Sequence, residues 1–147
     1  MSPTERQGTG SESDEAAAAM TAVSAFVASI NAHDVGGLVD QMTADHLFVD
    51  SLGAIVQGRE TMRAAWNGYF RMFPDFHIEV EQQVARGGMV LACGQTRGTY
   101  GAAGPTQPGD SWSAPAAWRV VIRDRRVAEW QVYCDNEPAR RVLALHS

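Results

Sequence analysis

The sequence lacks the features that would place it in or across a membrane. It contains no run close to the roughly 20 apolar residues that a membrane-spanning helix needs. Its first fifteen residues also lack the basic stretch followed by an apolar one that marks a secretory signal. We therefore expect a cytoplasmic protein that has no membrane partner.

Cysteine is scarce, and metal-ligand spacings are missing. The two cysteines, Cys93 and Cys134, form no CxxC pattern and lie inside apolar, strand-like runs, so both are predicted to be reduced core residues. His33, His77 and His146 show no metal-ligand spacing with one another or with acidic residues. The sequence therefore predicts neither a metal site nor a cofactor.

Clusters of basic residues are also few. The chain carries 12 Lys and Arg residues against 17 Asp and Glu residues, for a net charge of -5. The basic residues are scattered, except in the charged turn at residues 123–126 and the pair Arg140-Arg141. This distribution argues against a nucleic-acid partner.

The 147 residues suit one domain with a sizeable core. Residues 1–13 are polar and lack apolar periodicity, which predicts a disordered arm, and residues 14–147 are predicted to form a single domain. Apolar periods and turn residues predict helices at 14–30, 35–42, 59–73 and 137–145. They predict strands at 46–50, 55–57, 76–85, 89–100, 112–123 and 127–135.

This order of elements predicts an α+β fold in which a curved antiparallel sheet wraps a helical hairpin and a third helix. Such a sheet encloses a cone. The Gly- and Pro-rich residues 101–110 are too polar for the core and are predicted to form a lid-like loop.

Asp50 ends the first predicted strand and is the leading catalytic candidate. On the concave face its carboxylate would have partly apolar surroundings, which suit a general base. Alternatively, Asp50 only bonds the backbone of the Ser51-Leu52-Gly53 turn. His46 shares a strand face with Asp50, roughly 13 Å away, so the two could contact one ligand but not each other. A surface or helix-capping role for His46 is the alternative.

Asp135 ends the last predicted strand and could line the mouth of the same cone. Together, Asp50 and Asp135 could share acid and base work on a neutral substrate. The stretch from Asp135 to Pro138 also has the composition of a helix cap, so a structural role for Asp135 remains open.

Aromatic residues are unevenly distributed, and most are expected to be core. If the cone holds a cavity, five of them are its predicted walls, and a flat apolar ligand would suit them: Phe26, Trp66, Phe70, Trp118 and Trp130. Trp66 could also donate its indole N–H to a ligand atom. The face on which Arg119 lies is not decided by its neighbours.

The chain resembles the nuclear-transport-factor-two-like superfamily of cone-shaped proteins, which includes ketosteroid isomerases, SnoaL-like polyketide cyclases, scytalone dehydratase and limonene epoxide hydrolase. The resemblance rests on the order and spacing of residues 26–34, 49–53, 58–60, 73–75, 98–101 and 129–130. It implies a homodimer formed through the outer sheet face. It also implies that Asp50, sixteen residues after Asp34, is a general base like that of the isomerases.

The resemblance also shows departures. Where the isomerases carry the tyrosine and the acid of their oxyanion hole, this chain has Phe26 and Ala117, so steroid isomerisation is not expected. The resemblance to SnoaL-like cyclases implies a proton-transfer role for Asp135. The resemblance to limonene epoxide hydrolase makes Arg119 a ligand-binding candidate.

These observations predict a cofactor-free isomerase or cyclase that moves protons on a small apolar molecule bearing a carbonyl. A non-catalytic member that binds a ligand or partner in the same cone is the alternative. An epoxide hydrolase or dehydratase that uses pocket acids is a third possibility.

Overall fold

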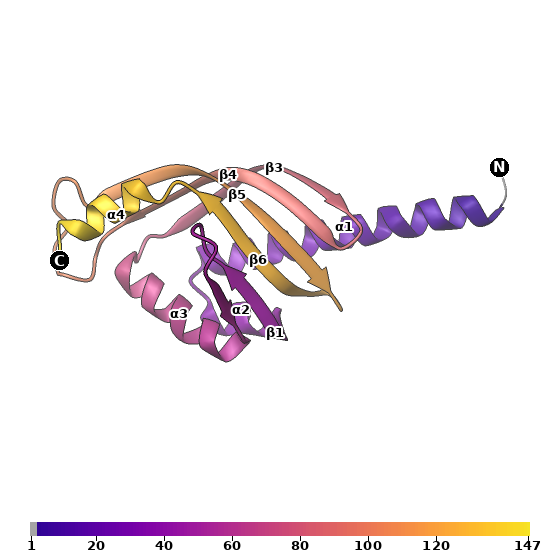
Figure 1. The fold of residues 1–147 in the computed structure, drawn as a ribbon, viewed down its shortest axis with the longest axis horizontal. Helices are drawn as coiled ribbons and strands as arrows, with labels where there is room; N and C mark the ends of the chain where they lie inside the picture. The colour runs from indigo at the N-terminus through magenta and orange to yellow at the C-terminus, as the bar shows by residue number, and fades with distance from the viewer. Residues whose placement is uncertain (1–2) are drawn as a thin grey trace.

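A six-stranded curved sheet arches over three helices, and a fourth helix closes one end (Figure 1). The computed structural model describes the backbone of residues 3–147 and the side-chain surroundings of residues 10–147. The helices are α1 (Pro3–Asn31), α2 (Val35–Asp40), α3 (Arg59–Met72) and α4 (Glu137–Ala144). The strands are β1 (Met42–Val49), β2 (Ile55–Gln57), β3 (His77–Arg86), β4 (Met89–Thr99), β5 (Ser111–Arg123) and β6 (Arg126–Cys134). The predicted α+β cone is confirmed.

Helix α1 begins earlier than the sequence predicts. It covers residues 3–13, where a disordered arm is predicted, and its N-terminal part extends past the end of the sheet (Figure 1). Pro3 suits the first turn of a helix, where its missing N–H is not needed, and no further proline interrupts the segment before Asn31. Residues 1 and 2 lie outside the described part of the chain.

The sheet is mixed rather than wholly antiparallel. Its strand order is β2-β1-β6-β5-β4-β3, and β1 runs parallel to β6, with Phe48 opposite Trp130. All the other pairs are antiparallel, as the hairpin pattern predicts. The β1–β6 pair brings the end of the first strand, where Asp50 follows, beside the last strand.

A bulge in β3 adds to the curvature of the sheet. The register between β3 and β4 shifts between Val80 and Gln82. Opposite the bulge, the Cβ of any residue larger than glycine at Gly94 would lie 1.8 Å from the carbonyl oxygen of Glu79. Only glycine lets the two backbones approach this closely, and a bulge bends the strand that carries it.

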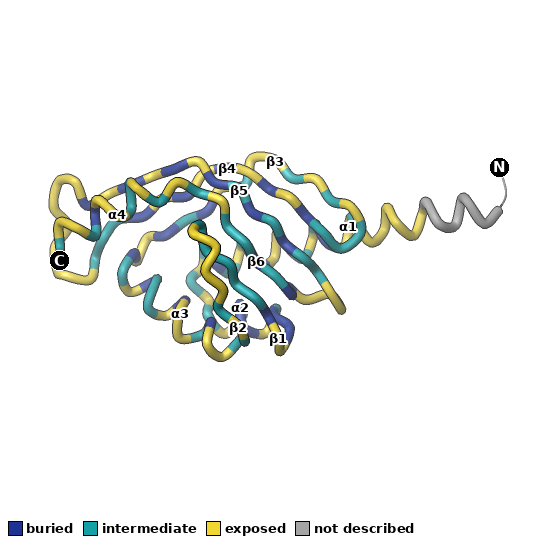
Figure 2. The backbone as a smooth tube through the Cα atoms, viewed as in Figure 1, coloured by how far each residue is buried: buried dark blue, intermediate teal, exposed yellow. Residues whose placement is uncertain are grey.

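Alternate residues of β4 and β5 face the core, as the period-two pattern predicts (Figure 2). Val90, Ala92, Trp118 and Val120 are among the buried members. Cys93 lies on the opposite face and is exposed, so its predicted core position is wrong. An apolar run does not by itself distinguish the two faces of a strand.

None of the described helices is long and apolar enough to span a membrane.

Candidate functional site

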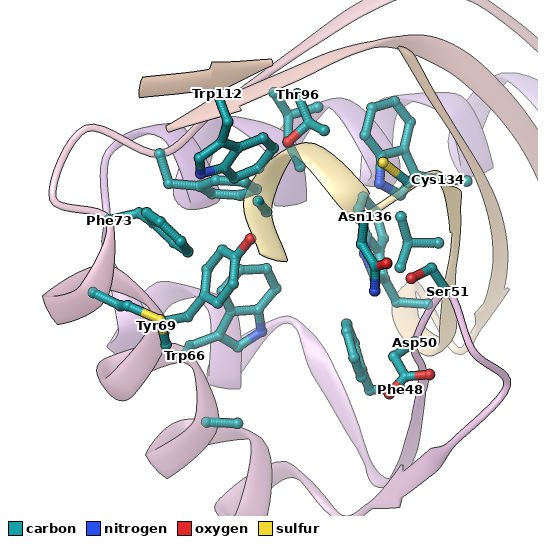
Figure 3. Close-up of a pocket in the computed structure, with 18 of the residues that line it drawn as sticks. Phe48, Asp50, Ser51, Trp66, Tyr69, Phe73, Thr96, Trp112, Cys134 and Asn136 are labelled. Carbon is teal, nitrogen blue, oxygen red and sulfur yellow. The ribbon is translucent and has the colours of Figure 1, made fainter. Parts of the chain in front are cut away.

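A cavity of about 350 Å³ lies between α3, the concave face of the sheet and α4 (Figure 3). Apolar and aromatic side chains form most of its wall. From the sheet and the β1 end these include Phe48, Phe76, Ile78, Trp112, Trp118, Trp130 and Val132, and from α3 and its C-terminus they include Met62, Ala65, Trp66, Tyr69, Met72 and Phe73. Such a cavity suits an apolar ligand of small to moderate size.

The aromatic residues of α3 face the cavity because of their spacing along the helix. Trp66, Tyr69 and Phe73 recur at intervals of three and four residues, which places them on one helix face. The Tyr69 ring contacts Phe76 edge-on at a centroid distance of 4.8 Å and Phe73 at 5.2 Å. Pro74 then prevents the helix from continuing. The aromatic wall is therefore rigidly packed.

Two side chains of α3 that line the cavity, Tyr69 and Trp66, carry hydrogen-bond donors, whereas the N–H edge of the Trp112 indole lies against the backbone at Gly98. The indole nitrogens of Trp66 and Trp112 are buried and have no hydrogen-bond partner among the described residues. Burial raises the pKa of the Tyr69 hydroxyl well above its ordinary value, and the nearby Cys134 thiol raises it further. Tyr69 therefore stays protonated and can donate. Buried donors without an acceptor are costly, so a ligand that brings an acceptor would gain from this wall.

Asp50 lies at the opposite edge of the cavity, beside Phe48 and Ser51 (Figure 3). Its Oδ1 accepts hydrogen bonds from the backbone N–H groups of Leu52 and Ala54, each at 2.9 Å. Asp50 therefore does bond the backbone of the turn, as the alternative interpretation of the sequence predicts. No hydrogen bond involves Oδ2 among the described residues, so the turn fixes one oxygen and leaves the other available.

Asp135 does not line the cavity. Its side chain is exposed, and its Oδ1 accepts from the backbone N–H of Glu137 at 3.0 Å, which caps α4. The cavity is lined instead by its neighbours Cys134 and Asn136. The predicted position of Asp135 at the mouth is therefore off by one residue, because side chains at a strand end alternate between the two faces.

Arg119 also lies away from the cavity. It is on the convex face of β5, where its Nη1 contacts Glu129 Oε2 at 2.7 Å. The residues on either side, Trp118 and Val120, are the ones that face the core. Arg119 is therefore half of a surface ion pair on the outer sheet face.

Phe26 and Phe70 belong to the core behind the cavity wall rather than to the wall itself. Phe26 packs on Trp130 at a centroid distance of 4.9 Å, and Phe70 stacks on His33 at 4.2 Å. Trp66, Trp118 and Trp130 do line the cavity. The sequence predicts that an aromatic residue is buried, but it does not predict whether that residue borders the cavity or is packed on all sides.

His46 is fully buried but does not line the cavity. Its Nδ1 donates to the carbonyl oxygen of Val127 at 2.7 Å, and its Nε2 has no hydrogen-bond partner among the described residues. Burial lowers the pKa of His46 even though this hydrogen bond favours its protonated form. The predicted surface or capping role is therefore wrong, and His46 is a neutral core residue.

Helix α4 forms a wall of the cavity that the sequence analysis missed. Asn136, Ala139, Arg140 and Leu143 line the cavity at helical spacing. This pattern of i, i+3, i+4 and i+7 was present in the sequence and could have identified the face. By contrast, no residue of the predicted lid at 101–110 lines the cavity.

A family model for the SnoaL-like domain matches residues 23–130. The chain belongs to this family. No protein of curated function matches this chain at a significant level.

Solved structures give the same fold. A candidate SnoaL-like polyketide cyclase from Shewanella denitrificans OS-217 superposes with a TM-score of 0.74 at 15% identity, over 86% of this chain and 97% of that one. An LEH-like epoxide hydrolase from M. tuberculosis gives 0.73 at 16% identity, over 89% and 92%. A protein with a ketosteroid isomerase-like fold from Catenulispora acidiphila DSM 44928, in complex with trimethylamine, gives 0.66 at 23% identity, over 76% and 83%. At these identities the superpositions show that the fold is shared, and they do not show which reaction the chain catalyses.

Proposed function

We propose that this SnoaL-like domain catalyses proton transfer, of the isomerase or cyclase type, on an apolar molecule that bears a carbonyl group. The observation that carries the proposal is the apolar cavity with the neutral donors of Tyr69 and Trp66 on one side and Asp50 on the other. No cofactor is needed, because both the base and the donors belong to the chain.

The donors would act on the carbonyl oxygen of the ligand. When a proton leaves the carbon next to a carbonyl, negative charge develops on that oxygen. The hydroxyl of Tyr69 and the indole N–H of Trp66 are neutral donors in a largely apolar wall, where hydrogen bonds to a developing oxyanion are stronger than in water. This pair replaces the donors that Phe26 and Ala117 cannot supply.

Asp50 would be the base. Its free Oδ2 takes the proton from the α-carbon, the C–H electron pair moves to form the C=C bond, and the carbonyl π electrons move onto oxygen. The protonated Asp50 then returns the proton to the same or another carbon, which regenerates the carboxylate. The two N–H groups on Oδ1 hold the carboxylate in position throughout.

Two observations favour the binding alternative. The hydrogen bonds of the turn already account for Asp50 Oδ1, and Asp135, the second predicted acid, lies outside the cavity. A member without catalysis would keep the aromatic wall and its donors and would bind an apolar molecule with an acceptor oxygen.

The exchange of α-protons for deuterium in 2-tetralone, followed by NMR in D2O, tests the proposal. Asp50→Asn keeps an oxygen for the turn but removes the base, and the exchange rate should fall by roughly 10²- to 10⁴-fold. Asp135→Asn is the matched control and should exchange like the wild type. No exchange above the buffer rate in the wild type, with 2-tetralone bound, would favour the binding alternative.

A further inference from the structure

One face of α4 lines the cavity with two polar side chains. Asn136 and Arg140 are four residues apart and therefore lie on the same side of the helix, with Ala139 and Leu143 beside them. A molecule in the cavity would contact α4 through these residues.

The Asn136 side chain is free to reach a ligand. Asn136 occupies the N-cap position of α4 but makes no capping hydrogen bond with its side chain, and Pro138 in the first turn has no N–H to offer it. The amide lies across the cavity from Tyr69 and Trp66 (Figure 3). It can therefore donate to a ligand group at this end.

Arg140 has no acidic partner among the described residues. The neighbouring carboxylate, Glu137, pairs with Arg141 at 3.1 Å, so it does not neutralise Arg140. Within the described part of the chain, Arg140 is the one cationic side chain that lines the cavity, and Asp50 is the one acidic side chain. No ion pair joins these two residues.

A guanidinium group at the edge of an apolar cavity is suited to a particular ligand chemistry. Its planar N–H groups match the two oxygens of a carboxylate, and because Arg140 is exposed we expect a modest attraction, like that of a surface ion pair. The amide of Asn136 adds a neutral donor on the same helix face.

We infer that the ligand of this cavity is an apolar acid, whose carboxylate binds Arg140 and Asn136. This inference rests on the proposed function, since it assigns the substrate class of the same cavity. The apolar body of the acid lies against the aromatic wall, and its carbonyl oxygen is directed to the donors of α3. Arg140 is then a specificity-determining residue rather than a catalytic one.

Two probes of the same ring system test this inference by calorimetric titration. One is 2-naphthol, a flat neutral molecule with a single hydroxyl, and the other is 6-hydroxy-2-naphthoate, which adds a carboxylate. The wild type should bind the carboxylate probe roughly fivefold more tightly than 2-naphthol. Arg140→Gln should abolish this preference and leave the affinity for 2-naphthol unchanged. Arg141→Gln, a neighbouring change on the ion-paired side of α4, should keep the preference.

A wild type that binds both probes equally, or prefers 2-naphthol, would overturn the inference. So would a preference that survives in Arg140→Gln. Binding of neither probe would contradict both the inference and the cavity on which the proposed function rests. Binding with the expected preference but without exchange in 2-tetralone would contradict only the proposed catalysis.

Discussion

His146 Nε2 lies 2.6 Å from Asp110 Oδ1, and this contact ties the chain after α4 to the end of the loop at residues 101–110. The side chain of Asp110 is buried, and its other oxygen accepts from the backbone N–H of Gln107. The His146 ring also stacks on Tyr100 at a centroid distance of 4.0 Å. The loop therefore anchors α4, and α4 in turn forms a wall of the cavity.

Loss of this anchor should loosen α4. Asp110→Asn removes the charge that His146 contacts, so amide protons of α4 should exchange with solvent faster than in the wild type, as measured by hydrogen exchange. Glu137→Gln breaks only the exposed pair with Arg141 and is the matched control. Equal exchange in Asp110→Asn and the wild type would contradict the anchoring role.

The anchor should also depend on pH. The hydrogen bond from Gln107 and then the contact with His146 lower the pKa of Asp110 below its ordinary value of 3.8. A carboxyl whose pKa is lowered by folding stabilises the native state above its unfolded pKa, and this contribution is lost as the pH falls through the lower, folded value. The stability difference between the wild type and Asp110→Asn, from urea unfolding, should therefore be full at pH 6 and shrink below about pH 3.8. A difference that is constant down to pH 2 would contradict this.

His46 should make stability fall in mild acid. Because burial lowers its pKa, the unfolded chain takes up a proton at a higher pH than the native state does. Stability should therefore decrease as the pH falls below about 6.5, the ordinary value, and level off below the native pKa. His46→Leu should remove this slope and should cost about 1–3 kcal/mol at pH 7, since Val127 loses its donor. An NMR titration that gives His46 a pKa above 6.5 would contradict the assignment.

Gly94 should be irreplaceable at the bulge of β3. The added Cβ of Gly94→Ala would meet the backbone of Glu79, which cannot move without breaking the β3–β4 pairing, so we expect a loss of at least about 2 kcal/mol in urea unfolding. Gly10→Ala is the control, because nothing lies within 4 Å of the Cβ that it adds in α1. Similar stabilities of the two variants would show that the backbones do not approach as described.

The sequence predicted the elements well because their signals are local. Pro74 ends the third helix, the turns at Gly87-Gly88 and at Asp124-Arg125 connect long strands, and period two identifies the buried face of β5. The parallel pairing of β1 with β6 could not be predicted in this way, because its partners are about 80 residues apart in the sequence and no turn joins them.

The site was predicted less completely, for physical reasons that individual residues illustrate. The position of Asp50 at the cavity could be predicted because a carboxylate at a strand end is a local feature. Asp135 missed the cavity by one residue, since a period of two makes the face depend on the exact register. Tyr69 could not be identified as a donor from the sequence, because that role depends on where its hydroxyl lies relative to the cavity.

The most direct measurement of the central claim, that neutral donors in the cavity stabilise a developing oxyanion, is the rate of α-proton exchange of 2-tetralone in Tyr69→Phe. This change removes one hydroxyl from the wall and keeps the ring, and Tyr133→Phe makes the same change at an exposed position on the outer face. We expect a roughly 10²-fold slower exchange in Tyr69→Phe and a wild-type rate in Tyr133→Phe. Equal rates in the two variants, at equal stability, would contradict the claim.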